Sequence, residues 1–142
     1  MSKHFSFDTP SRNLSHFRGT WALRREIWSG HEFDGIFSGI AKFTNDRTMN
    51  LQYVEEGILH LTSSPSMIGR RSYVWTPSLD VYFVTGEFFH KIPAHGGNVT
   101  YLCPPDIYSG QYEFTNWPKW SLKWSINGPK KNYELVTFYQ PT

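Results

Sequence analysis

Four side chains that can carry a charge or a proton stand at alternate positions of strand-like stretches, in step with apolar residues. They are Arg25, Glu55, Arg71 and His90. Alternation of this kind places side chains on one face, so we expect all four to point into the same interior. Because a lone charge is costly to bury, they must pair with each other, with water or with a ligand. Two arginines in such a place could fork onto a carboxylate or phosphate, which predicts an anion site. The alternative is that the arginines and Glu55 form a structural network. For His90 the alternative is a core position in which neighbouring groups complete its hydrogen bonds.

A second group of reactive side chains lies in the run from Tyr101 to Phe114, which holds the only cysteine, Cys103, followed by two prolines. Two consecutive prolines cannot donate to a β-ladder. We therefore expect the strand to end near Cys103 and pairing to resume from Gly110. Asp106 and Tyr108 would then lie on a rigid corner, at the rim of a pocket or in a structural plug.

Two kinds of catalysis are compatible with these residues. Cys103 could act as a nucleophile with His90 as its base and Asp106 as the orienting carboxylate, although no basic residue adjoins the cysteine in sequence to favour the thiolate. His90 with Glu55 or Asp106 could serve as general acid and base, as in an isomerase or cyclase. The spacing requires neither, so the sequence leaves open whether the protein is an enzyme.

Metal and cofactor signals are weak. The histidines show no metal-ligand spacing; they are His4, His16, His31, His60, His90 and His95. Phosphate-loop, dinucleotide and serine-elbow motifs are absent. We predict no metal site and no cofactor.

Composition favours one β-rich domain. The chain has 142 residues, of which 18% are aromatic and 18% charged. A domain of this length can bury a core without disulfides, and so many rings suit cross-strand packing. The net charge of +2, with no Lys/Arg run longer than two residues, argues against a nucleic-acid partner.

The cellular compartment is inferred from features that the sequence lacks. A single cysteine excludes an internal disulfide and fits a reducing compartment. The N-terminus lacks an apolar signal-peptide segment, and no apolar run approaches the ~20 residues that a membrane span needs. We expect a cytoplasmic protein without a membrane span; its oligomeric state is left open.

About ten short strands separated by turn signals follow an irregular arm at residues 1–13, with a possible helical turn from Ser11 to Phe17. Short strands without long crossovers predict an antiparallel up-and-down barrel. The aromatic side chains expected to line its interior are Phe37, Phe43, Tyr53, Tyr73, Trp75 and Trp124.

The stretch Gly19-Thr-Trp21 at the start of the first strand resembles the Gly-x-Trp signature of calycins, the lipocalin and fatty-acid-binding group. The wider pattern resembles the domain-of-unknown-function family DUF6314 over residues 15–139. The matching pieces are Phe17-Arg-Gly-Thr-Trp21, Tyr53-Val-Glu-Glu-Gly57, Arg70-Arg-Ser-Tyr-Val-Trp75, Gly86-Glu-Phe-Phe-His90, Leu102-Cys-Pro-Pro-Asp-Ile-Tyr108 and Gly128-Pro-Lys-Lys-Asn-Tyr133.

The resemblance implies a lipocalin-like barrel and no activity. In calycins the tryptophan plugs the closed end, often under an arginine or lysine from a late strand. Related nitrobindin-type barrels bind heme through a late histidine, and this chain has none after His95. Heme held in that way is therefore disfavoured.

Together these patterns predict a single lipocalin-like barrel, residues 1–142, that binds a partly apolar small molecule with an acidic group. An acid–base enzyme in the same barrel is the alternative, and a filled barrel that serves as a protein-interaction module is the third. The predicted ligand-binding residues are Arg25, Glu55, Arg71, Tyr73, His90, Cys103, Asp106, Tyr108 and Tyr133.

Overall fold

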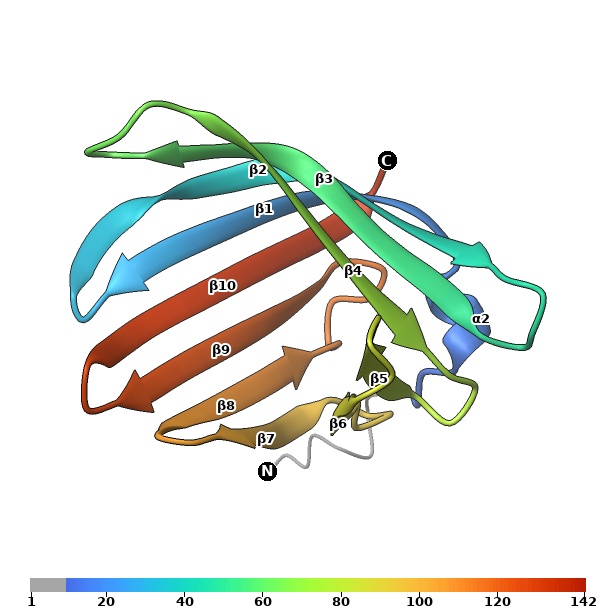
Figure 1. The fold of residues 1–142 in the computed structure, drawn as a ribbon. Coiled ribbons are helices and arrows are strands. Elements are labelled where there is room, and N and C mark those ends of the chain that lie inside the picture. Colours follow the sequence, from blue (N-terminus) through green and yellow to red (C-terminus); the bar gives the residue numbers. More distant parts are fainter. Residues whose placement is uncertain (1–9) are drawn as a thin grey trace, which may run out of the picture.

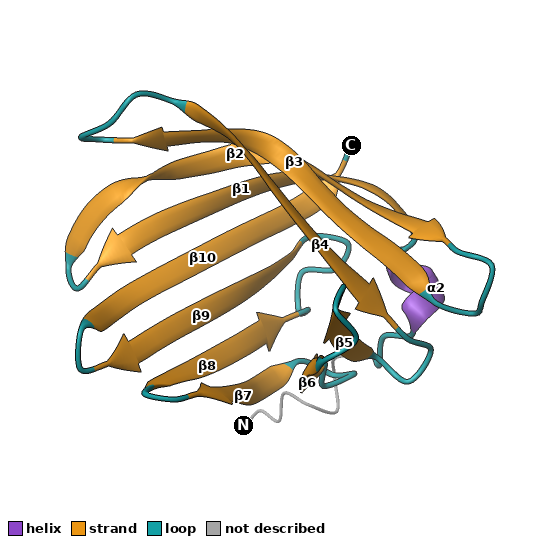
Figure 2. Cartoon of the chain, viewed as in Figure 1, coloured by secondary structure: helices purple, strands orange, loops and turns teal. Residues whose placement is uncertain are grey.

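The computed structural model describes residues 10–142, so most of the predicted N-terminal arm lies outside the described residues. One short helix and ten strands follow each other along that part of the chain (Figures 1 and 2). Their bounds are α2 Leu14–Phe17, β1 Gly19–Ser29, β2 Glu32–Asn45, β3 Leu51–Leu61, β4 Met67–Trp75, β5 Asp80–Phe83, β6 Phe88–Lys91, β7 Gly97–Cys103, β8 Asp106–Glu113, β9 Trp120–Gly128 and β10 Lys131–Pro141. No helix of this part is long and apolar enough to cross a membrane.

The strands form one antiparallel sheet in the order β6-β5-β4-β3-β2-β1-β10-β9-β8-β7. Strands that are neighbours in sequence pair with each other, except β6 and β7 at the two edges of the sheet. The first and last strands also pair, from Trp21↔Pro141 to Ser29↔Tyr133. The sheet curls into a nearly closed barrel, whose seam lies between β6 and β7 (Figure 1). The predicted all-β, up-and-down barrel with a short N-terminal helical turn is confirmed.

Small residues on β2 allow the sheet to coil tightly. Gly39 faces Gly57 on β3, and a Cβ added to Gly39 would lie 2.0 Å from the backbone oxygen of Glu56. No side chain fits at that distance, so the glycine is needed for the close approach of the two backbones. The next inward residue, Ala41, is fully buried.

One end of the barrel is closed by aromatic rings and by α2. The Trp21 side chain is 5% exposed, and its indole Nε1 donates a hydrogen bond to the backbone oxygen of Phe17 at 2.8 Å. The rings of Trp117 and Trp120 pack edge-on against it. At this end the guanidinium of Arg12, which precedes the helix, lies 4.4 Å from the Trp117 ring centre. The predicted burial of Trp21 at one end is therefore confirmed, with rings over it.

The predicted strand end near Cys103 is confirmed, but the predicted corner at Asp106 and Tyr108 is wrong. β7 ends at Cys103 and β8 begins at Asp106, with Pro104 and Pro105 between them. Pairing resumes at once, Cys103 with Asp106 and then Tyr101 with Tyr108, rather than from Gly110. The physical reason is that both prolines occupy the hairpin turn, where the ladder requires no donor.

Candidate functional site

A buried ion pair lies at the centre of the barrel. Arg25 on β1 donates two hydrogen bonds to the Glu55 carboxylate on β3, at 2.6 and 2.9 Å. Its Nε also donates to the Thr137 hydroxyl on β10 at 2.7 Å. Arg25 is 7% exposed and Glu55 1%. Because β2 lies between β1 and β3, the small inward residues Gly39 and Ala41 leave the space that the guanidinium crosses.

Two tyrosines extend this network. The Tyr53 hydroxyl donates to Glu55 Oε1 at 2.5 Å and also bonds the Tyr139 hydroxyl at 2.8 Å. Burial by itself would raise the pKa of Glu55, but the hydrogen bonds and charge of Arg25, together with Tyr53, hold it below its ordinary value. Burial opposes the charge of Arg25 as well, yet its bonds to Glu55 raise its pKa above the usual value. Both partners are therefore ionised, and the pair is neutral as a unit.

Arg71 is the third charged residue of the interior. It lies on β4 directly opposite Glu55, with its side chain on the inward phase but exposed to solvent. Among residues 10–142 no hydrogen bond or ion pair joins its guanidinium, although its charge helps to lower the pKa of Glu55. The interior thus carries one more positive charge than negative.

Two spaces share the residues of this cluster in their lining. The inner cavity has a volume of about 40 Å³, and the wider one has a volume of about 190 Å³. Arg25, Glu55, Arg71 and Leu135 line both. Of the predicted aromatic lining, Tyr53, Tyr73, Trp75 and Trp124 line the inner cavity and Phe37 the wider one. Phe43 lines neither, since it packs in the core against Phe17, Tyr53 and Trp75.

His90 lines the inner cavity from β6. It is 4% exposed, and its Nε2 is hydrogen-bonded to the Tyr112 hydroxyl on β8 at 2.8 Å, across the seam of the barrel. Its buried Nδ1 has no hydrogen-bond partner among the described residues. Burial lowers the pKa of His90 to about 4, so the ring is neutral at neutral pH.

The remaining predicted site residues line neither of these spaces. Cys103 is exposed on the hairpin turn, and Tyr108 packs against the rings of Tyr101 and Trp124. Asp106 is 8% exposed and pairs with Lys131 at 3.0 Å.

Tyr133, at 40% exposed, lies near the start of β10. The structure thus brings together Arg25, Glu55, Arg71, Tyr73 and His90, and places the other four apart. The carboxylates proposed to work with His90 are each held by a cation instead, Glu55 by Arg25 and Asp106 by Lys131.

Sequence reasoning missed three polar members of the cluster: Tyr112, Thr137 and Tyr139. Their strands alternate in the same way as the others, with Thr137 and Tyr139 on the phase of Leu135. The alternation of β10 therefore predicts that both side chains point inward. Threonine and tyrosine are common in strands, however, so their residue types alone do not suggest a functional role.

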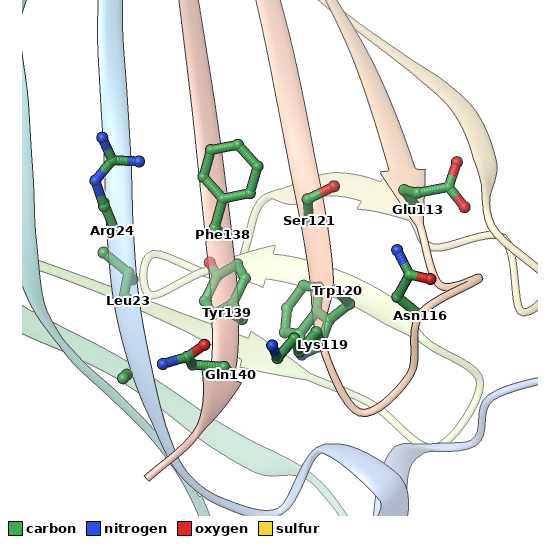
Figure 3. A pocket seen from close by; sticks show the side chains of 11 residues that line it. Leu23, Arg24, Glu113, Asn116, Lys119, Trp120, Ser121, Phe138, Tyr139 and Gln140 are labelled. Atoms are coloured by element: carbon green, nitrogen blue, oxygen red, sulfur yellow. The ribbon is translucent and has the colours of Figure 1, made fainter.

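An open hollow of about 720 Å³ lies elsewhere, along neighbouring strands β1, β10, β9 and β8. Arg24, Phe138 and Ser121 line it side by side (Figure 3). Arg24 is paired there with Glu26 at 2.9 Å. None of the predicted site residues lies in this hollow. Within residues 10–142 no group of three or more His, Cys, Asp and Glu side chains could hold a metal ion.

Comparison with known proteins gives a family but no activity. The model of the "Family of unknown function (DUF6314)" matches residues 17–141. No curated protein matches the chain. Among solved structures, that of a redesigned beta barrel is similar, with 12% sequence identity, a TM-score of 0.47, and coverage of 94% of this chain and 98% of that chain.

Proposed function

The chain belongs to the DUF6314 family, a family of unknown function, and we propose that it is a calycin-type barrel that binds a small, partly apolar molecule through an acidic group. The uncompensated charge of Arg71 is the observation that carries this proposal. Arg25 and Glu55 neutralise each other at 2.6 Å, and His90 adds no charge at neutral pH because its pKa is about 4. One cation in a partly enclosed space favours an anionic occupant.

Arg71 is better placed for a ligand than Arg25. Three of the N–H groups of Arg25 are already used, two by Glu55 and one by Thr137. Arg71 keeps its planar donor fork free of described partners and is reached by solvent. A guanidinium of this kind can bind a carboxylate through two parallel hydrogen bonds.

The wider space supplies an apolar surface for the body of the ligand. Besides the charged cluster, Gly69 and Arg70, which pairs with Glu56, its lining is mainly hydrocarbon: Ile27, Phe37, Leu59, Met67, Ile68 and Leu135. Met67 and Ile68 are 49% and 86% exposed, so apolar surface there is open to water and would be covered by a bound molecule.

The volumes limit the size of the ligand. Pockets for drug-sized molecules measure roughly 300–1,000 Å³, whereas the two spaces here hold about 40 and 190 Å³. We therefore expect the acidic head to lie at Arg71 and a compact apolar body, such as one aromatic ring or a short alkyl chain, to occupy the wider space.

A matched pair of probes tests this proposal. Hydrocinnamate carries a carboxylate on a phenylpropyl skeleton, and hydrocinnamyl alcohol is its uncharged counterpart. In an NMR-detected titration we expect the acid to bind at least about tenfold more tightly, since it alone makes a charge-assisted contact. Equal binding of acid and alcohol would contradict the proposal. Native mass spectrometry of protein purified from its own host would show which acid it retains.

A further inference from the structure

The hydrogen bond between His90 and Tyr112 leaves one buried donor without an acceptor. The two residues share a single bond of 2.8 Å, from His90 Nε2 to the Tyr112 hydroxyl. His90 is 4% exposed and Tyr112 2%, so water outside the barrel does not complete their hydrogen bonding. Both residues line the inner cavity, so any further partner must lie there. The Nδ1 atom of His90 has almost no accessible surface toward it.

The protonation states fix the number of donors. With a pKa of about 4, the His90 ring carries one N–H at neutral pH. Burial, with the nearby tyrosines Tyr139 and Tyr73, raises the pKa of Tyr112, so the phenol keeps its O–H. The pair therefore has two donor groups, and only one of them is used in the hydrogen bond between the two residues.

The two tautomers of His90 differ in where the unpaired donor lies. If the Tyr112 hydroxyl donates to Nε2, the proton of His90 stands on Nδ1, which has no partner in the described chain. If instead Nε2–H donates to the Tyr112 oxygen, the phenolic O–H is the unpaired donor. Because Nδ1 is almost inaccessible, no acceptor in the cavity can reach its N–H, and the first arrangement leaves a buried donor unpaired at a cost in free energy. The second arrangement is therefore favoured, and its phenolic O–H belongs to a residue that lines the cavity.

The cavity beside this donor is small and positively charged. Its volume is about 40 Å³, and Arg71 lines it together with His90 and Tyr112. A space of this size suits a small acidic head group, and a planar carboxylate is a compact group that offers two acceptor oxygens.

We propose that the His90–Tyr112 pair is a donor subsite that binds one oxygen of the ligand's acidic group, while Arg71 binds the other. This assignment rests on the proposed function and narrows the ligand class to compact carboxylic acids. The pair then contributes to selectivity, because an alcohol or amide of the same shape offers one acceptor where the site presents two separate donor groups.

The experiment follows the ring nitrogens of His90 by NMR during titration of the wild-type protein with hydrocinnamate. We expect the Nδ1 and Nε2 resonances to shift together with binding, and Tyr112→Phe to weaken binding about tenfold. Tyr108→Phe, on the same strand but outside the cavity, is the matched control and should bind as the wild type does.

Two results would overturn the assignment. If the His90 resonances stay unmoved at saturation while Arg71→Leu still weakens binding, the cavity holds only water and the proposed function stands without this subsite. If hydrocinnamate binds no more tightly than hydrocinnamyl alcohol, the proposed function and the subsite both fall. Because the NMR titration uses the wild-type protein, it tests the proposed subsite even if Tyr112→Phe fails to fold.

Discussion

Removing the charge of Glu55 while keeping its shape should strongly destabilise the barrel. In Glu55→Gln the guanidinium of Arg25 stays 7% exposed but loses the carboxylate that accepts its bonds at 2.6 and 2.9 Å. Breaking a buried ion pair by removing one partner typically costs about 3–5 kcal/mol, because the other charge is left uncompensated. We expect a loss of unfolding free energy in that range, a large share of the roughly 5–15 kcal/mol that holds a domain of this kind together.

The neighbouring residue provides the control. Glu56 points outward and forms an exposed pair with Arg70 at 3.6 Å, both side chains being more than half exposed. An exposed pair of this kind contributes about 0–1 kcal/mol. Glu56→Gln should therefore unfold at nearly the same urea concentration as the wild type.

The double variant Arg25→Met/Glu55→Leu separates pairing from packing. With both charges gone, no buried ion is stranded, and hydrophobic replacements of a buried pair are often neutral or stabilising. We expect the double variant to lose less stability than Glu55→Gln by about 2 kcal/mol or more. Urea unfolding followed by tryptophan fluorescence measures all four proteins. If Glu55→Gln is as mild as Glu56→Gln, the pair is not buried as described and the reasoning fails.

Three further perturbations have defined outcomes. Trp21→Ala should cost about 3–5 kcal/mol in urea unfolding, because a 5% exposed indole and its bond to Phe17 are lost; a midpoint near that of the wild type would place Trp21 outside the core. The pKa of His90 is lowered from 6.5 to about 4, so the unfolded chain takes up this proton first as the pH falls. About 3 kcal/mol of stability, present above pH 6.5, is then lost as the pH falls to about 4. If a His90→Gln variant loses the same stability over this pH range, His90 is not the group responsible. Gly39→Ala should destabilise the β2–β3 pairing, since its Cβ would lie 2.0 Å from a backbone oxygen, whereas melting of the exposed Ser38→Ala should match the wild type.

The inward phase of the charged residues followed from alternation alone. Arg25, Glu55 and His90 stand in step with apolar neighbours, and in a strand this period determines which face a side chain takes. The structure places all three inside and buried. The up-and-down order followed from short connections, which leave antiparallel neighbours as the simplest arrangement.

Depth along the barrel axis could not be read from the sequence. Arg25 and Arg71 share the inward phase, yet one is 7% exposed and the other is open to solvent. Which of them pairs with Glu55 depends on register and on what lies between the strands. Arg71 is directly opposite Glu55, but the small residues of β2 let Arg25 reach it instead. Alternation carries no information on either point.

The hairpin at Pro104 and Pro105 shows a second limit. The inability of proline to donate was used to predict a long interruption, but a turn needs no donors at those two positions. Asp106 therefore lies in β8 from its first residue and pairs with Lys131 at 3.0 Å. The proline rule predicted correctly that the strand ends near Cys103, but it could not predict how many residues the interruption spans.

The role of Arg71 is the central claim, and it is tested most directly by titrating hydrocinnamate into two arginine variants. Arg71→Leu removes the uncompensated inward cation, and the control Arg24→Leu removes an outward arginine on β1 that pairs with Glu26 at 2.9 Å and lines neither ligand space. Calorimetry or NMR should show binding about tenfold weaker for Arg71→Leu, the modest size reflecting a solvent-exposed guanidinium. Arg24→Leu should bind as the wild type does, and both variants should melt near the wild-type temperature because Glu55 keeps Arg25 as its partner. Equal affinity in all three proteins, or equal weakening in the two variants, would contradict an anion site at Arg71.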